Sequence, residues 1–195
     1  MATIGVSKPM YAIYKETAGV VTYSGGGILA KAVEFSASIE SASDNNLYAD
    51  NGIAESDKSF TGGTLSITTD DMEQAASAAI LGITASTLTI GEATVSELVY
   101  NDDMEQPNLG FGIIIKRKKN GVEKWRAIVF PKIKFSIPED AATTQGESIE
   151  WQTPELEATI MRDDTAKHAW KREATFDIEA KAVAYIEHLL NIGGE

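Results

Sequence analysis

The stretch GFGIIIKRKKNGVEKWRAIVF, residues 110–130, decides the fold class of this chain. Two runs rich in β-branched and aromatic residues flank the dipeptide Asn120-Gly121. Asn-Gly favours the positive φ angles of a type I′ turn, whose twist matches that of two antiparallel strands. The stretch therefore predicts a β-hairpin with its turn at residues 120 and 121.

Alternation of apolar and polar residues, which indicates half-buried strands, recurs along the chain. In residues 28–40 the apolar positions are Val33, Phe35, Ala37 and Ile39, and the polar positions are Glu34, Ser36, Ser38 and Glu40. In residues 125–137 one face holds Trp125, Ala127, Val129, Ile133, Phe135 and Ile137, and the other holds Lys132, Lys134 and Ser136. The stretches TLSITT (64–69) and GESIEWQTPELEATI (146–160) alternate more weakly. We expect each strand to bury one face and to leave the other in water.

Two segments have the composition and spacing of helices. Residues 71–82, DMEQAASAAILG, are rich in alanine and end at Gly82, a common helix stop. Residues 177–192 place Val183, Ile186, Leu189 and Leu190 on one stripe, with Asp177 as the expected cap. With the strands, these segments predict a mainly β (α+β) fold: one domain built as a β-sandwich or barrel, with a flanking α-helix and a short C-terminal helix.

The pentapeptide DDMEQ occurs at residues 70–74 and again at residues 102–106. In the first copy, Asp70 or Thr69 is the expected N-cap of the alanine-rich helix, which puts Glu73 at the third helical position, as in a capping box. The second copy precedes Pro107 and is expected to form a turn. Because the two contexts differ, we predict neither an internal repeat nor a metal site.

The polar segment Ser41–Ser59 fits neither a strand nor a helix pattern and is expected to be a long loop. Loops of this length in a compact domain are usually functional or disordered. The segment contains Leu47, Tyr48 and Ile53, which a merely solvated loop does not need. We therefore expect it to pack against something outside its own domain.

Composition and charge exclude several function classes. The chain of 195 residues has no cysteine, which excludes disulfides, thiol catalysis and cysteine-ligated zinc. No apolar run approaches the length of about 20 residues that spans a membrane, and the N-terminus lacks the pattern of a secretory signal. The net charge of −12 argues against a general nucleic-acid binder, although it allows a surface that nucleic acid passes without sticking.

No group of residues forms a persuasive active site. The acidic stretch from Asp44 fails the EF-hand pattern, since Tyr48 and Ala49 stand where a ligand and a glycine are required. Neither histidine, His168 nor His188, belongs to a nucleophile motif. We predict no enzyme activity and no cofactor. The basic tip KRKKNG at residues 116–121 is expected to face solvent, or to pair with an acidic surface on a neighbouring copy.

In this sequence several stretches, taken in order, resemble the major tail proteins, the tail tube subunits of phages with long non-contractile tails. They are GVSKPMYAIY (5–14), NNLYADNGIAESDKSFTGGTLSITTDDM (45–72), the region from Gly110 to Asp163, and FDIEAKAVAYIEHLLN (176–191). The resemblance implies a tail-tube-type β-sandwich or barrel with an N-terminal arm at about residues 1–10. It also implies rings of six copies that stack into the tube through which viral DNA is ejected.

The resemblance also implies roles for residues and partners. Strand faces that are polar would line the water-filled lumen: Glu34, Ser36, Ser38, Glu40, Thr64, Ser66 and Thr68, with Glu150 and Gln152 as weaker candidates. The long loop would contact a neighbouring ring or subunit through Asp44, Asn46, Leu47, Tyr48, Asp50, Ile53, Glu55 and Lys58. The expected partners are further copies of the chain, a tape measure protein, tail tip and terminator proteins, and viral DNA in passage, with no membrane. The expected location is the virion tail, after assembly in the cytoplasm of the host bacterium.

Two alternatives stay open from the sequence. One is the inner tube of a contractile tail, a phage-tail-like bacteriocin or a secretion apparatus, which share the same architecture. The other is a ligand-binding β-sandwich, although Trp125 and Trp151 lie in strand patterns typical of a core or an interface and not at loop tips.

Overall fold

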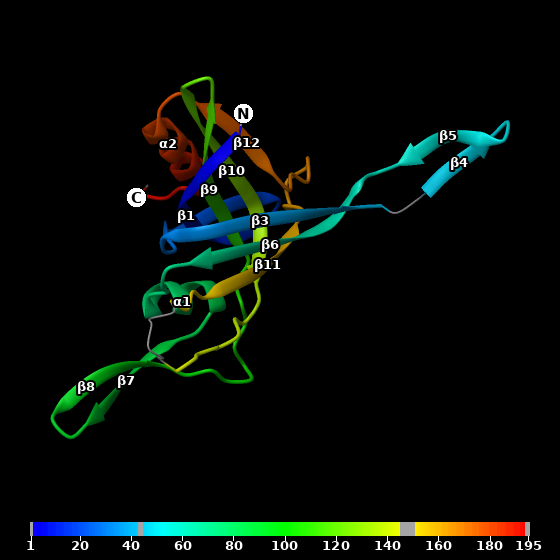
Figure 1. Cartoon of the computed structure of the whole chain (residues 1–195). Helices are drawn as coiled ribbons and strands as arrows, with labels where there is room; N and C mark the ends of the chain where they lie inside the picture. The colour runs from blue at the N-terminus through cyan, green and yellow to red at the C-terminus, as the bar shows by residue number, and fades with distance from the viewer. Residues whose placement is uncertain (1, 43–44, 145–150, 194–195) are drawn as a thin grey trace.

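The computed structural model describes residues 2–42, 45–144 and 151–193 (Figure 1). Eight strands form one antiparallel sheet. Their order across the sheet is β2 (Val20–Ile28), β1 (Ala2–Thr17), β9 (Leu109–Lys119), β10 (Val122–Phe135), β11 (Glu155–Met161), β6 (Phe60–Thr69) and β3 (Ala32–Ser41), with β12 (Arg172–Phe176) paired to the first half of β10. The predicted mainly β fold, with a flanking helix and a short C-terminal helix, is confirmed.

Two further hairpins and two helices complete the chain. The strands β4 (Asn45–Ala49) and β5 (Gly52–Asp57) pair only with each other, as do β7 (Ala85–Ile90) and β8 (Ala93–Leu98). Figure 1 shows both hairpins projecting away from the main sheet, and we call them the β4–β5 arm and the β7–β8 arm. The helices are α1 (Gln74–Leu81) and α2 (Glu179–Leu190). Neither helix has the length and apolarity that crossing a membrane requires, within the part of the chain described.

The hairpin predicted at residues 110–130 is confirmed by strands β9 and β10. Val122 lies opposite Lys119, so that Asn120 and Gly121 form the two-residue turn. Both have positive φ angles, 51° and 80°, as a type I′ turn requires. This hairpin forms the centre of the sheet, because β1 pairs along β9 and both β11 and β12 pair along β10.

The prediction that each strand buries a single face is wrong for β10. Ala127 and Val129 pack against α2, whereas Ile128 and Phe130 point into a core on the other side of the sheet. The register with β9 then shifts between Phe130 and Ile133, where β10 carries one extra residue. A bulge of this kind reverses the parity of the strand, so Ile133 continues on the side of Phe130.

The sheet therefore separates two hydrophobic cores. The larger core lies inside the curl of the sheet and includes α1; its largest fully buried side chains are Phe111, Phe130, Phe135, Leu65, Ile67, Ile80, Leu81, Leu109, Ile113, Ile133 and Leu156. The smaller core lies between the sheet and α2 and is formed by Met10, Ala12, Ile114, Ala127, Val129, Ala182, Ile186 and Leu190. Ile186 and Leu190 belong to the apolar stripe predicted for the C-terminal helix.

Both helices begin later than the sequence predicts. Helix α1 starts after Glu73, which is its N-cap and makes no side-chain capping bond, so the predicted capping box is absent. The carboxylate of Asp70 instead accepts a hydrogen bond from the Lys31 backbone N–H at 3.0 Å. Helix α2 starts after Ile178, its N-cap, and Asp177 forms an ion pair with Lys124 and does not cap the helix. The predicted stop at Gly82 is confirmed by its left-handed φ of 70°.

One segment that was predicted to be irregular forms a pair of regular strands. The predicted loop at residues 41–59 is the β4–β5 arm; in it, Asp50 and Asn51 have positive φ angles of 48° and 64°, typical of a tight hairpin turn. In the span named as the N-terminal arm, at about residues 1–10, the chain from Ala2 onward begins β1, which pairs with β9. The correction at residues 41–59 replaces an expected loop by a hydrogen-bonded hairpin within the described residues.

Candidate assembly surfaces

The strand register brings the seven predicted lumen residues onto one face of the sheet. Residues that lie directly opposite each other on paired strands project to the same side. The opposed pairs on β3 and β6 are Glu34 with Thr68, Ser36 with Ser66, and Ser38 with Thr64, and Glu40 lies opposite Gly62. The sequence could place these residues on two separate strands, and the structure joins them into one surface.

This surface continues across two more strands that the sequence analysis did not assign to it. On β11, Glu155, Glu157 and Thr159 lie opposite Thr68, Ser66 and Thr64. Ser66 Oγ donates a hydrogen bond of 2.6 Å to Glu155. The sequence showed the alternation in ELEATI. It did not show which strand this segment would pair with. We call the whole set the polar face: Glu34, Ser36, Ser38, Glu40, Thr64, Ser66, Thr68, Glu155, Glu157, Thr159 and Lys134.

The charge of the polar face is mainly negative. It carries the carboxylates Glu34, Glu40, Glu155 and Glu157 and the amine of Lys134, which lies opposite Thr159. Lys132 does not add a free charge, because its Nζ lies 2.6 Å from Asp164 and 5.2 Å from the centre of the Tyr14 ring. This contact is one reason that the pKa of Asp164 lies below its usual range.

Of the two weaker lumen candidates, only Gln152 is described, and it does not lie on a strand of the polar face. Glu150 lies outside the described residues. Gln152 lies before β11 begins, and its side-chain amide donates a hydrogen bond of 2.9 Å to Thr143 Oγ1. Trp151 next to it is 85% exposed, so it is not part of the core of a single chain.

The polar face ends at strand β3, whose outer edge has no partner strand among the described residues. Its apolar side is also largely uncovered: Val33 is 54% exposed and Ile39 is 39% exposed. Ala32 and Phe35 pack on the larger core, and the Phe35 ring centre lies 6.4 Å from those of Phe111 and Phe130. An unpaired edge of this kind is a template for pairing with another chain.

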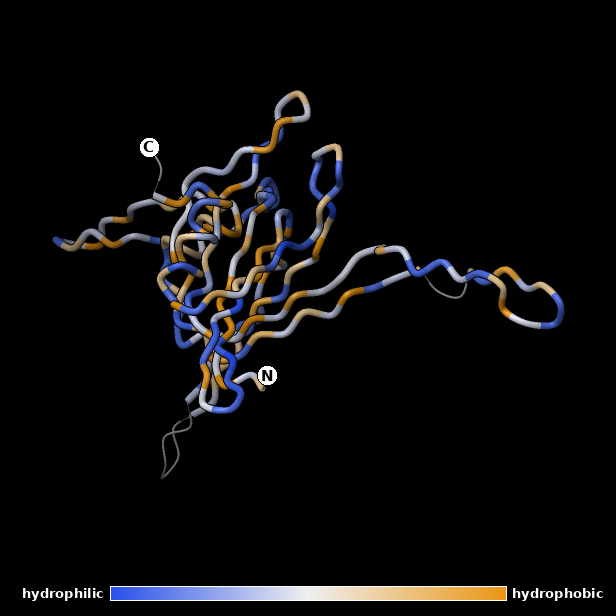
Figure 2. The backbone as a smooth tube through the Cα atoms, turned by 90° about the horizontal axis from the view of Figure 1, so that it is seen from above, coloured by the Kyte–Doolittle hydropathy of each residue, from blue (hydrophilic) through white to orange (hydrophobic). Residues whose placement is uncertain are grey.

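The β4–β5 arm carries most of the predicted contact residues and projects away from the main sheet (Figure 2). Leu47, Tyr48 and Ile53 are 62%, 67% and 59% exposed. Tyr48 lies opposite Ile53, whereas Leu47 lies opposite Glu55, so the predicted anchors divide between the two faces of the arm. Asn46 is also in β4, Asp50 is in the turn, Lys58 follows β5, and Asp44 lies outside the described residues.

The β7–β8 arm was not predicted, although the sequence contains its signal. The run TLTIGEATV alternates on both sides of Gly91-Glu92, and glycine at the first turn position is typical of a type II′ hairpin. Ile90 lies opposite Ala93, and Gly91 has a positive φ of 64°. Leu88, Ile90 and Val95 on this arm are 44%, 63% and 42% exposed.

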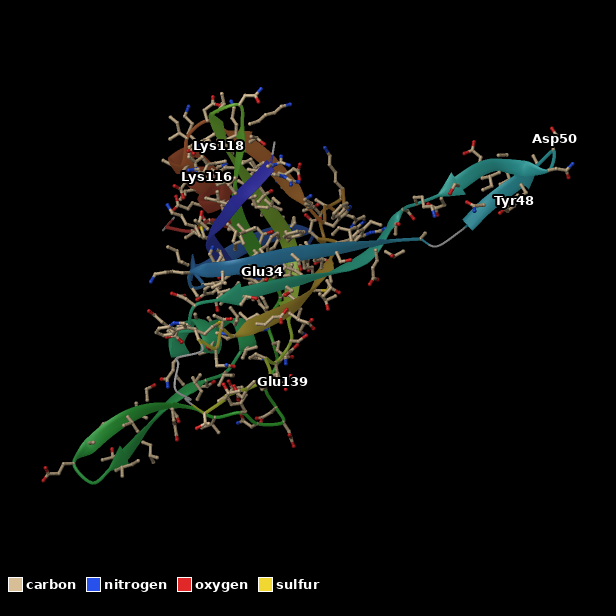
Figure 3. The ribbon with its side chains drawn as sticks, viewed as in Figure 1. Glu34, Tyr48, Asp50, Lys116, Lys118 and Glu139 are labelled. Atoms are coloured by element: carbon tan, nitrogen blue, oxygen red, sulfur yellow. The ribbon has the colours of Figure 1, made fainter. Side chains whose placement is uncertain are left out.

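Opposite ends of the molecule carry opposite charge. Residues 59–115 contain eight acidic residues and no lysine or arginine, whereas residues 116–126 contain six lysines and arginines and one acid. Figure 3 places Lys116 and Lys118 at the end of the sheet beside α2, and Glu139 and the β7–β8 arm at the other end. The acid in the basic stretch is Glu123, whose pKa is lowered first by its hydrogen bond with Lys116, 2.7 Å away, and then by Lys118.

The described residues contain no group of three or more histidine, aspartate and glutamate side chains arranged to hold a metal ion. The arrangement favours contacts between protein surfaces: one polar face, one unpaired edge, two arms with exposed apolar side chains, and two oppositely charged ends. Comparison with family models and with curated proteins finds no match to this chain.

Proposed function

We propose that this protein is a structural subunit of a phage virion, which assembles into stacked rings and forms the tail tube of a long non-contractile tail. The tube is the conduit for DNA ejection. The observation that supports this most is the polar face, because it runs across four strands and stops at the unpaired edge of β3. A strand from a second copy would satisfy that edge and extend the polar face into the neighbour.

The charge of the polar face suits a channel for DNA. Duplex DNA carries one negative charge per about 1.7 Å of its axis. Four carboxylates against one lysine repel it at close range, so DNA would slide along this wall and not bind to it. Hydroxyl groups between the carboxylates keep the wall wet, as a wide barrel interior requires.

The exposed apolar residues also fit a subunit that is incomplete as a single chain. Large exposed apolar side chains that gather on one element mark contact surfaces. Eight of them lie on the edge strand β3 and on two arms that pair with no other strand of the sheet. The net charge of −12 keeps free subunits apart in solution before assembly.

The edge of β3 can be tested directly. Ile39→Lys places a charge on the uncovered apolar side of β3, and we expect it to reduce the mass of the assemblies measured by light scattering after size exclusion. Ala184→Lys, which adds the same charge to an exposed position of α2, is the matched control. Equal assembly by the wild type and both variants would contradict the role of β3.

A further inference from the structure

The β7–β8 arm has two chemically different faces. On one face Leu88 lies opposite Val95 and Ile90 lies opposite Ala93. On the other, Thr87 lies opposite Ser96 and Thr89 lies opposite Thr94, with the two threonine hydroxyls 3.5 Å apart. Water can hydrogen-bond to the hydroxyl groups of the second face. The side chains of the apolar face are more stable when they are buried away from water.

The described residues leave that apolar face largely uncovered. Leu88, Ile90 and Val95 are all more than 40% exposed, and none of them belongs to either hydrophobic core. A two-stranded hairpin is marginally stable on its own in water. An arm of this kind, held only at its base, is therefore expected to be completed by a partner.

Charge complementarity points to a second copy of this chain as the partner. The arm and the segments beside it carry Glu92, Glu97, Asp102, Asp103 and Glu105 with no basic residue. The opposite end of the molecule has the complementary combination. There, at the start of β1, at the β9–β10 turn and just after β12, Ile4, Val122 and Ile178 are 50%, 52% and 53% exposed. Thr3 and Gly5, on either side of Ile4, pair with Arg117 and Lys116, and Val122 pairs with Lys119. Lys116 and Lys118 also contact Glu123, and Asp177 beside Ile178 pairs with Lys124. We call this end of the sheet the basic end.

We propose that the β7–β8 arm of one copy docks through Leu88, Ile90 and Val95 on the basic end of the next copy. This contact rests on the proposed function, and it joins copies end to end, in addition to the side-by-side pairing through β3. Because the two surfaces are different, the contact is heterologous and repeats without closing, which is the geometry of a growing stack. Glu92 and Glu97 would then meet the lysines of the basic end.

A cross-linking experiment tests which surfaces meet. Because the chain has no cysteine, each variant carries one thiol only. Mixing Ile90→Cys with Val122→Cys under assembly conditions and adding a short bismaleimide should give a dimer band on a denaturing gel. Mixing Ile90→Cys with Thr22→Cys, at an exposed position of β2, should not. A dimer in neither mixture, or equally in both, would overturn the proposal.

A pair of substitutions separates this proposal from the proposed function. Leu88→Ser with Ile90→Ser should leave the melting temperature unchanged and shorten tubes to single rings in electron micrographs. Thr87→Ala with Thr89→Ala, on the hydroxyl face, should assemble as the wild type does. Normal tubes from the serine variant would overturn the docking contact alone, as would a lowered melting temperature, since these side chains would then support their own fold. Absence of any assembly by the wild type would instead overturn the proposed function.

Discussion

Two glycines of β9 determine how closely α2 approaches the sheet. A Cβ atom at Gly110 would lie 2.5 Å from Leu190 Cδ2, and one at Gly112 would collide with Ile186. Both contacts belong to the smaller core, so each glycine is a packing requirement and not a turn residue. The sequence showed the glycines of GFGIII but not the helix that needs them.

We therefore expect Gly112→Ala to lower the free energy of unfolding, because the added methyl group pushes α2 away from the sheet. Overpacking of a core by one such group typically costs about 1–3 kcal/mol. Gly27→Ala is the control, since a Cβ there has no atom within 4 Å. Urea unfolding curves would measure both. Equal midpoints for the two variants would show that α2 does not pack on β9 as described.

The ion pairs of Glu173 predict that the stability of the fold depends on pH. Hydrogen bonds from Lys171, at 2.8 Å, and then from Arg126 lower its pKa from 4.5 to about 2 in the folded chain. A lowered pKa means that the folded state favours the charged form. The contribution of the charged Glu173 to the free energy of unfolding is therefore complete above pH 4.5 and is lost as the pH falls toward about 2.

Glu173→Gln should consequently lower stability at neutral pH and make stability less dependent on pH between 4.5 and about 2. Glu92→Gln, at the tip of the β7–β8 arm and without an ion pair among the described residues, should change neither. Thermal unfolding across this pH range provides the measurement. A Glu173→Gln profile that parallels the wild type would contradict the ion pair between β10 and β12.

At the scale of elements, the two arms predict which faces join neighbouring copies. On the β4–β5 arm, Tyr48 and Ile53 form a cross-strand pair, whereas Leu47 points to the other face beside Glu55. Aromatic side chains dominate the binding energy of interfaces. We expect Tyr48→Ser with Ile53→Ser to leave folded monomers that do not form tubes.

Leu47→Ser is the matched control for that variant, because it removes one exposed apolar side chain from the opposite face of the same arm. It should weaken assembly less than the paired substitution does. Sedimentation velocity at equal concentration would compare the size of the assemblies formed by the wild type, the paired variant and Leu47→Ser. A stronger defect in Leu47→Ser than in the paired variant would place the contact on the other face of the arm.

The elements also show where sequence patterns succeed and fail. Asn120-Gly121 predicted its hairpin because the two positive φ angles are a local property of those residues. The alternation in residues 125–137 predicted the wrong face for half of β10, because the bulge after Phe130 depends on pairing with β9. The β4–β5 arm was mistaken for a loop because Asn-Gly stands at residues 51–52, one position after the actual turn, in a strand pair that buries little.

At the scale of the whole molecule, the polar face exists because the strands β3, β6, β11 and β10 pair in one particular register. The sequence predicted seven polar residues for it on two stretches, and the structure places all seven on one face. It could not identify Glu155, Glu157 and Lys134 as their neighbours, since pairing between β6 and β11 joins segments almost ninety residues apart. The opposite charge of the two ends likewise follows from the fold, because Glu105 comes before β9 and Lys116 lies near the far end of that strand.

The polar face predicts a charge effect on DNA passage. Glu34→Lys with Glu40→Lys reverses two of its four carboxylates and should leave the tubes intact while slowing or stalling DNA ejection, because cations on the wall bind phosphate. Glu16→Lys with Glu187→Lys, on β1 and α2, provides a matched control. Ejection measured in virions that carry each variant should be impaired only by the first. Normal ejection with the first variant would show that these glutamates do not face the lumen.

The central claim is that this chain is built to assemble with itself. Electron microscopy of the purified, cysteine-free wild type over a series of increasing concentrations tests it most directly. We predict rings that stack into tubes with a continuous β-sheet wall and a central channel. Particles that stay single chains of 21.0 kDa at every concentration would contradict it.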